Sequence, residues 1–475
     1  MIMEKLFKLK ENKTDVRTEV IAGCTTFVTM AYIIALNPNL LTNFDVGSPL
    51  WNGVFLATCL ASAIGTICMA FLANKPFAMA PGMGLNSFFA VVIANIVTLT
   101  GATYAQSFQA ALCIILMEGV IFLILSLSGA RDKIVSAIPA NIRIGISPAI
   151  GLMLMNIGFG SNAGVYDESG NAHYVMADFF GALTPKILKD SMGGSYPAMV
   201  LTVVTMFVGL FVMIILSKRG KGSAVLVGIL IASLVYWTGE LLFLGISPFG
   251  SITVASFIPP FKDMVSTTLF KFDFALLMKM GWFSVITVVL TYCMLDLFDT
   301  LGTLVGTAHK AGMLDKDGNM PKMKEALISD AIGTIAGAAT GTSTVTTFVE
   351  STSGVEAGGR TGLTALTTGV CFLLSIFLAP IVADIPAAAT SPALIYVGIV
   401  MLSELRQINL RDITEFAPVF VMIIAMPISG SIGHGIGLGL ITYTICKLFT
   451  GRRKDIPIPT IIISILFLLK FFIAA

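Results

Sequence analysis

The stretch GTSTVTTFVESTSGVEAGG at residues 341–359 interrupts an apolar part of the chain, and NKPFAMAPGMGLNSFFA at residues 74–90 does the same in the other half. Prolines and glycines break a helix in the earlier stretch, and β-branched residues precede a polar, glycine-rich run in the later one. Unwound backbone is tolerated in a bilayer only where it lines a protein cavity. In a membrane protein, these two stretches therefore predict broken segments around a cavity.

The composition places the chain in a membrane. Of its 475 residues, 56% are hydrophobic and 12% are charged, whereas a soluble domain has roughly 25% charged residues. The chain therefore lacks the polar surface that water requires, and we predict an integral membrane protein. Long apolar runs indicate helices, because a membrane β-barrel alternates apolar and polar residues. The net charge of +2 argues against nucleic acid as a partner.

Apolar runs of roughly 20 residues, each long enough for a transmembrane helix, recur along the chain. They fall near residues 20–41, 53–73, 81–98, 103–127, 134–158, 197–216, 222–240, 282–304, 326–340, 343–359, 361–382, 390–404, 413–428 and 431–449. A last run at 457–474 leaves the count between fourteen and fifteen. We expect about fourteen, with residues 413–475 forming either two or three spans.

Basic residues indicate which loops face the cytoplasm. The N-terminal arm at residues 1–19 is basic, and basic residues recur in alternate loops. The intervening loops at 42–52 and 99–103 contain no Lys or Arg. We therefore expect a multi-pass protein of the cell (plasma or inner) membrane with a cytoplasmic N-terminus.

The two interrupted stretches occupy matching positions in the two halves of the chain. The tripeptides IPA (138–140) and SPA (147–149) also recur in order, as IPA (385–387) and SPA (391–393). Seven spans per half is an odd number, so the halves have opposite topology. Interrupted spans at matching positions of inverted halves are typical of a transporter's midplane binding site. The alternative is that Gly and Pro are simply frequent in membrane helices.

Acidic side chains deep in apolar runs are candidate site residues, since inserting each one costs on the order of 3 kcal/mol. Asp296 and Asp299 are three residues apart and share one helix face. Two neighbouring carboxylates cannot both ionise easily in low dielectric, so we expect one of them to exchange a proton near neutral pH. Glu350 lies inside the later interruption. The structural alternative for all three is a carboxylate that only satisfies the backbone of broken helices.

Other polar and aromatic residues of the apolar runs are weaker candidates. Asn86 follows the earlier interruption, and its amide offers a donor and an acceptor to a planar ligand, with helix capping as the alternative. Glu118 stands alone in its span, so a structural hydrogen bond to a neighbouring helix is expected. Phe348 or Phe27 is expected to form an aromatic wall against a flat ligand, and Tyr32 can also stack on one.

No cofactor or metal site is expected. The seven cysteines form no CxxC pair and the three histidines are widely spaced, so neither a disulfide framework nor a zinc site is predicted. The motifs GxxxxGK[ST] and HExxH are absent from the sequence, and ATP-driven transport by this chain alone is therefore not supported.

Four blocks of the sequence resemble a known family. They are TTFVTMAYIIALNP (25–38), APGMGLNSFFA (80–90), DLFDTLGTLVG (296–306) and TSTVTTFVESTSGVEAGGRTGLTA (342–365). These blocks are similar to the AzgA-like purine permeases, a branch of the nucleobase–cation symporter (nucleobase–ascorbate transporter) superfamily. The resemblance runs from about residue 12 to residue 450.

The resemblance implies an all-α polytopic membrane fold of fourteen spans in a 7+7 inverted repeat. Spans 3 and 10 would be broken and contain short strands, and a core domain would move against a gate domain. The expected divisions are an N-terminal arm (1–19), two core segments (20–132 and 282–383) and two gate segments (133–281 and 384–475).

The resemblance also implies residue roles. In the family, substrate is bound by an Asn of the third span, acids of the eighth and a Glu of the tenth, matched here by Asn86, by Asp296 or Asp299, and by Glu350. Relatives that carry uracil or xanthine have a Glu-His-x-Gly-type motif in the eighth span, where this chain reads DTLG at 299–302. That departure favours the purine branch and leaves proton coupling to the carboxylates.

The sequence thus predicts a secondary active transporter that imports hypoxanthine, guanine or adenine by proton symport with alternating access. Its partners would be the base, protons and membrane lipid, and the resemblance also allows a homodimer. One alternative is an anion carrier of the same architecture, which the midplane carboxylates disfavour. Another is a multi-span membrane enzyme, for which the sequence offers no metal or nucleophile cluster. The preferred purine, and sodium in place of protons, are left open.

Overall fold

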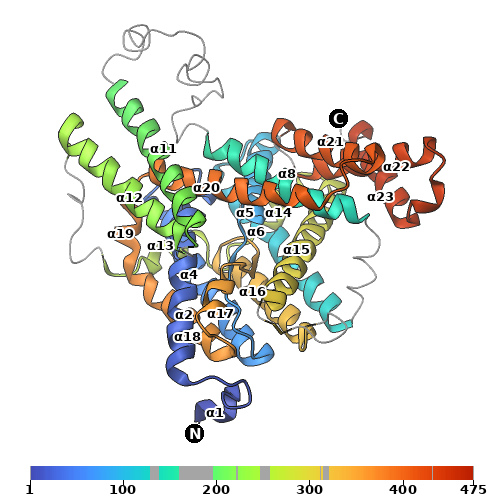
Figure 1. The fold of residues 1–475 in the computed structure, drawn as a ribbon. Coiled ribbons are helices and arrows are strands. Elements are labelled where there is room, and N and C mark those ends of the chain that lie inside the picture. Colours follow the sequence, from blue (N-terminus) through green and yellow to red (C-terminus); the bar gives the residue numbers. More distant parts are fainter. Residues whose placement is uncertain are drawn as a thin grey trace.

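Helices make up most of the chain (Figure 1). The computed structural model describes residues 2–128, 139–159, 196–220, 223–246, 257–310, 312–313, 320–429 and 432–473. The start of the apolar run predicted at 134–158, and the boundary between residues 132 and 133, lie outside the described residues.

The first half of the chain contains helices and one short strand. In order they are α1 (Ile2–Phe7), α2 (Val16–Met30), α3 (Ile33–Leu41), α4 (Pro49–Cys68) with a π-helical extension (Met69–Ala73), β1 (Met79–Pro81), α5 (Met83–Thr100), α6 (Tyr104–Ser128), α8 (Ala140–Gly158), α11 (Tyr196–Lys218), α12 (Ala224–Gly239) with a π-helical extension (Glu240–Leu244), α13 (Phe261–Thr267) and α14 (Phe274–Met278).

The second half repeats this alternation of long helices around one strand. In order the elements are α15 (Trp282–Lys310), α16 (Met323–Thr340), β2 (Val345–Thr347), α17 (Ser351–Glu356), α18 (Gly362–Leu374), α19 (Ala379–Ala383), α20 (Ala387–Leu402), α21 (Ile413–Ser429), α22 (Ile432–Phe449) and α23 (Ile458–Ile473). Three of these helices, α21, α22 and α23, lie between residues 413 and 473.

Eight helical segments of the described chain are long and apolar enough to cross a membrane. They are Val16–Leu41, Pro49–Ala73, Met83–Thr100, Tyr104–Ser128, Pro197–Lys218, Ala224–Leu244, Gly362–Ala383 and Ala387–Arg406. Shorter apolar helical stretches add to them at Ile144–Gly158, Trp282–Leu297, Ile413–Ser429 and His434–Phe449. The chain is therefore a mostly helical, multi-pass membrane protein.

The first apolar run, expected to be one helix, is divided into α2 and α3. Pro38 has no N–H, so it cannot bond the carbonyl of Ile34, and its ring disfavours a regular helix in the preceding turn. The N–H groups of Ile34 and Ala35 instead donate three residues back, to Ala31 and Tyr32, at 3.2 Å each. The break places Tyr32 between the two helices.

β1 and β2 pair with each other as a two-stranded antiparallel sheet that joins the two halves of the chain. The register sets Met79 opposite Thr347, Ala80 opposite Thr346 and Pro81 opposite Val345. Pairing continues at both ends. The N–H of Gly82 donates to the carbonyl of Thr344 at 3.1 Å, and the N–H of Phe348 donates to that of Ala78 at 3.0 Å.

Threonines of α4 and α16 satisfy backbone groups on the outer sides of the strands. The Thr66 hydroxyl donates to the Met79 carbonyl at 3.0 Å, and the Met79 N–H donates to the Thr66 oxygen at 2.9 Å. The Thr334 hydroxyl donates to the Val345 carbonyl at 3.3 Å. Both threonine side chains are fully buried. Each strand is thus bonded to its partner strand and also to a helix.

Glycine pairs allow two helix crossings to be close. Where α4 crosses α16, a Cβ on Gly65 would lie 3.3 Å from the Cα of Gly333. Where α8 crosses α20, a Cβ on Gly151 would lie 2.8 Å from the carbonyl oxygen of Gly398, and the reverse contact would be shorter. Larger side chains would push these helices apart, as is usual for small-residue contacts between membrane helices.

The long helices pack in two groups. In one, α4 packs on α16 and α18, α6 on α15 and α16, and α2 on α17 and α18. In the other, α8 packs on α20 and α21, and α11 packs on α12 and α20. In Figure 1 the α8, α20 and α21 helices lie across the upper part of the view, and α2, α17 and α18 lie below them.

Replacing Thr66 with Val tests the support of β1. The change leaves the N–H and the carbonyl of Met79 unpaired in a buried site, and each costs about 1–3 kcal/mol. We therefore expect Thr66→Val to lower the Tm of the detergent-purified protein by several degrees, measured by thermal unfolding. Thr98→Val is the control, because exposed Thr98 bonds only the Ala94 carbonyl of its own helix. Equal Tm values for both variants would contradict the role of Thr66.

Candidate functional site

The predicted site residues gather around the strand pair, but they differ in exposure. Asn86 lies on α5, Asp296 and Asp299 lie on α15, and Phe348 and Glu350 lie between β2 and α17. Asp299 is exposed and Glu350 is partly exposed. Asn86 and Asp296 are fully buried, and the Phe348 side chain is 6% exposed. In this conformation only Asp299 and Glu350 of the five present an accessible polar group.

Asp299 faces the junction between β1 and α5. A Cβ on Gly82 would lie 3.4 Å from Oδ2 of Asp299 and 2.7 Å from Cγ2 of Thr346. The absence of a side chain at Gly82 therefore lets the backbone at the start of α5 approach α15 and β2 closely. The carboxylates of Asp296, Glu350 and Glu404 are near enough to Asp299 to repel its negative charge.

Glu350 is held by a tyrosine. The Tyr32 hydroxyl donates to Oε1 of Glu350 at 2.7 Å, across the junction of α2 with α3. The Glu350 side chain does not cap α17, so the capping role considered from the sequence is not observed. Its carboxylate remains available to a ligand.

Asn86 connects α5 to the segment before β2. Its Oδ1 accepts a short hydrogen bond from the Ser343 hydroxyl, and its Nδ2 donates to the Pro81 carbonyl at 3.3 Å. Both ends of the amide are therefore engaged within the protein in this conformation. Asn86 lies inside its helix and not at the cap position, which Gly82 occupies.

Buried polar groups meet at Thr300. Its Oγ1 lies 2.9 Å from Oδ1 of Asp296, 3.0 Å from Oδ2 of Asp330 and 2.7 Å from Oγ1 of Thr346. Each of the three contacts needs a hydrogen between its two oxygens, but the two threonine hydroxyls supply only two. A protonated carboxyl group of Asp296 or Asp330 can supply the third hydrogen. The cluster is therefore suited to hold a proton.

Asp330, Thr300 and the hydroxyl of Tyr32 are site residues that the sequence analysis missed. Asp330 is an acid in the apolar run 326–340, the same signal that marked the other carboxylates. The contacts of Thr300 and Tyr32 join segments far apart in the chain, so no local pattern reveals them. For Glu118, the expected structural hydrogen bond is present. It accepts from the hydroxyl of Thr344 at 2.6 Å, a residue of the segment before β2 and not of a helix.

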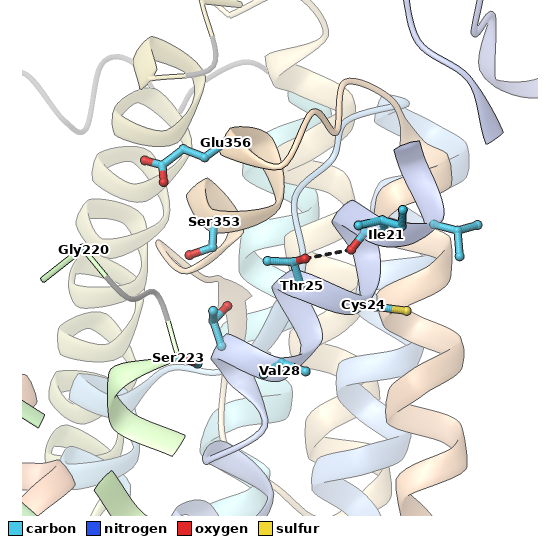
Figure 2. A pocket seen from close by; sticks show the side chains of 10 residues that line it. Ile21, Cys24, Thr25, Val28, Gly220, Ser223, Ser353 and Glu356 are labelled. Carbon is cyan, nitrogen blue, oxygen red and sulfur yellow. Dashed lines mark hydrogen bonds between the residues drawn. The ribbon is translucent and has the colours of Figure 1, made fainter. Parts of the chain in front are cut away.

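A cavity of about 530 Å³ lies near the site in the chain. Its lining residues come from α2, α17 and the segment before α12, and are Val20, Ile21, Cys24, Thr25, Val28, Thr29, Gly220, Ser223, Ser353 and Glu356. Figure 2 shows Ser353 and Glu356 across the cavity from Ile21 and Thr25. Thr29 precedes Tyr32 by one helical turn, and Ser353 follows Glu350 by about one turn. Two of the lining residues are therefore about one turn from Tyr32 and Glu350.

Within the described chain, no three His, Cys, Asp or Glu side chains come together in a way that could hold a metal ion. The chemistry that the site offers is hydrogen bonding and proton exchange by carboxyl groups.

Comparison with known proteins identifies the family. Residues 17–438 match the Permease family. The chain belongs to this family. The permease is 39% identical to the adenine permease AdeP of Escherichia coli (strain K12), covering 99% of this chain and 96% of AdeP. It is 37% identical to the guanine/hypoxanthine permease PbuO of Bacillus subtilis (strain 168), covering 98% of this chain and 100% of PbuO.

These relatives confirm the family resemblance drawn from the four sequence blocks. They are named as permeases, and the protein is accordingly a transporter and not an enzyme. Among solved structures, the transmembrane domain of the cyanobacterial bicarbonate transporter BicA has a TM-score of 0.60 at 15% identity, covering 89% of this chain and 97% of that one. At this identity the likeness concerns the fold alone.

Variants of Asp330 test the proton in the Thr300 cluster. Asn at position 330 supplies an N–H in place of the carboxyl proton, so we expect Asp330→Asn to keep a Tm close to that of the wild type. Asp330→Ala leaves partners unpaired and should cost about 1–3 kcal/mol. Raising the pH should lower the Tm of the wild-type permease, because the folded state then loses the shared proton. The Tm of the Asn variant should depend less on pH.

Thermal unfolding of the purified variants across a pH series measures both effects. If Asn and Ala were equally destabilising at every pH, the cluster would not depend on the third hydrogen.

Proposed function

We propose that the permease imports the purine nucleobases hypoxanthine, guanine or adenine by proton symport. Two relatives that match nearly the whole chain are named as an adenine permease and a guanine/hypoxanthine permease. The observation that carries the proposal is the pair of accessible carboxylates, Asp299 and Glu350, next to the strand pair. Ring N–H groups of a purine base are the donors that such acceptors pair with.

In this proposal the base lies between Asp299 and Glu350, next to the buried residues of the site. Asn86 sets the orientation of the base and Phe348 stacks on it. Both are buried in the present conformation, so they contact the base after a local rearrangement. A pocket built from such hydrogen bonds rejects a wrong base strongly, because it leaves buried polar groups unpaired.

Protons couple to transport through Asp296, Asp299 and Glu350. The hydrogen count at Thr300 supports a proton shared by Asp296 and its neighbour Asp330. Thr346, the fourth member of that cluster, belongs to β2 and also contacts Gly82 beside Asp299. A change in protonation at Asp296 can therefore affect the base site through one residue, Thr346. Neutralising a midplane carboxylate would lower the cost of moving the loaded site across the membrane.

Fourteen spans in a 7+7 inverted repeat account for the packing. Such a repeat relates each span to the one seven spans later. It therefore relates the α4–α18 contact to the α16–α6 contact, the α2–α18 contact to the α15–α6 contact, and the α11–α20 contact to the α21–α8 contact. All of these contacts are present. The same operation relates Gly65 to Gly333 and Thr66 to Thr334. In this arrangement spans 3 and 10 contain β1 and β2, and α23 follows the fourteenth span.

The two packing groups support a core domain and a gate domain that move relative to each other in alternating access. The core would comprise residues 20–132 and 282–383, and the gate residues 133–281 and 384–475, with residues 1–19 as the N-terminal arm. We further propose that the protein lies in the plasma or inner membrane with this arm in the cytoplasm. Lipid would surround the protein, with a homodimer as the expected assembly.

The cavity distinguishes a base from an anion. Glu356 is the charged residue of its lining, none of the lining residues is Lys or Arg, and the remainder are apolar or hydroxyl-bearing. A neutral base with N–H donors is compatible with that surface, whereas an anion would be repelled by the carboxylate. The cavity therefore disfavours an anion carrier, although BicA shares the fold.

Uptake of labelled hypoxanthine, guanine, adenine and uracil by cells that lack their own base permeases tests this function. We expect the purines to be taken up and a protonophore to abolish the uptake. Asp299→Ala and Glu350→Ala should reduce uptake more than 100-fold, since each removes a partner of the base. Glu11→Ala, at an exposed carboxylate of the N-terminal arm, should leave uptake unchanged.

Membrane content of each variant is measured alongside uptake, to separate loss of transport from loss of protein. Wild-type uptake in both alanine variants would refute the assignment of these carboxylates. Absence of any purine uptake by correctly inserted wild-type protein would refute the proposed function.

A further inference from the structure

Tyr32 joins the break in the first apolar run to the carboxylate of Glu350. Its side chain is 2% exposed, and its hydroxyl lies 2.7 Å from Oε1 of Glu350. The two residues belong to opposite halves of the chain. A hydrogen bond to an ionised carboxylate is roughly twice as strong as one between neutral groups.

The position of Tyr32 is set by the backbone on both sides. α2 ends at Met30 and α3, whose residues are all buried, begins at Ile33, so Tyr32 occupies the turn between the two helices. The Tyr32 carbonyl accepts from the N–H groups of Ala35 and Leu36, at 3.2 and 3.0 Å. These bonds fix the main chain at Tyr32, and burial fixes its ring.

Glu350 depends on this contact for its orientation. The carboxylate does not cap α17, and Tyr32 is the side chain that bonds it within the described chain. The terminal torsion of a glutamate side chain is broad and roughly two-fold. The backbone N–H of Glu350 is also a donor to the carboxylate, but it belongs to the same residue. Without the phenol of Tyr32, no other side chain of the described residues would hold the two oxygens, which could exchange places or turn away from the site.

We propose that Tyr32 is a positioning residue for substrate, which holds Oε1 of Glu350 so that Oε2 is presented to an N–H group of the base. This inference rests on the proposed function, because it requires a base that donates to Glu350. An acceptor that is already oriented loses less freedom on binding, and part of the affinity follows from this preorganisation. The hydrogen bond also stabilises the ionised form of Glu350, which is the form that accepts.

Two titratable side chains face Glu350, Tyr32 from the junction of α2 with α3 and Asp299 from α15. They act in opposite senses. The phenol donates to the carboxylate and favours the ionised form, whereas the negative charge of Asp299 disfavours it. Removing the phenol donor alone therefore makes Glu350 retain its proton to a higher pH.

Calorimetric titration of the purified full-length protein with adenine, guanine and hypoxanthine, across a pH series, tests the role of Tyr32. We expect Tyr32→Phe to weaken binding of the preferred base about tenfold, the effect of losing one charge-assisted hydrogen bond. The pH below which binding is lost should also move upward. A variant that merely perturbs packing would weaken binding by the same factor at every pH.

Tyr104→Phe is the matched control. Tyr104 is a half-buried tyrosine, and its hydroxyl donates to the Leu41 carbonyl at 2.9 Å, so the substitution deletes a tyrosine hydrogen bond away from Glu350. Base affinity and its pH dependence should be unchanged in this variant.

The inference is overturned if Tyr32→Phe binds the base like the wild type, or binds it more weakly by a factor that does not vary with pH. Failure of the wild-type protein to bind any of the three bases would instead refute the proposed function.

Discussion

A strand inside a bilayer has to find partners for its N–H and C=O groups within the protein, because lipid offers none. In this permease β1 and β2 pair with each other, and the hydroxyls of Thr66 and Thr334 bond their outer sides. Much of the surrounding structure serves this arrangement. The Gly65–Gly333 crossing brings α4 and α16 close enough for the two threonines to reach the strands.

The site is a consequence of the same pairing. Each strand ends where a helix begins, so Gly82 at the start of α5 and Glu350 at the start of α17 lie next to the sheet. α15 adds Asp299 beside Gly82 and Thr300 beside Thr346. Residues from both halves of the chain therefore surround one small region, although Asn86 and Ser343, which bond each other, are 257 residues apart.

The sequence was informative where the physical signal is local. Low charge and long apolar runs predicted a membrane protein, and prolines, glycines and β-branched residues marked the stretches that contain β1 and β2. The four blocks that resemble the purine permeases led to the correct family. The division of the first run was missed because its cause, Pro38, lies several residues after the break, and one proline alone does not show where a helix will part.

The details of the site were beyond the sequence for a different reason. Acidic residues in apolar runs could be found, and Asp330 was overlooked although it carries the same signal. Which of these side chains are buried could not be predicted from the sequence, because burial depends on which face of each helix packs against which neighbour. Asp296 and Asp299 share a helix and lie three residues apart, yet one is enclosed with Asp330 and the other is exposed beside Gly82.

The strand pair also constrains how the protein is made. β1 belongs to the first half of the chain, and its partner is complete only when the ribosome has reached Thr347. Until then, the backbone of residues 79–81 has no strand to pair with. The hydrogen bonds between β1 and its partner strand can therefore form only after the second half of the chain has been made. Neither half of the permease can complete its fold without the other.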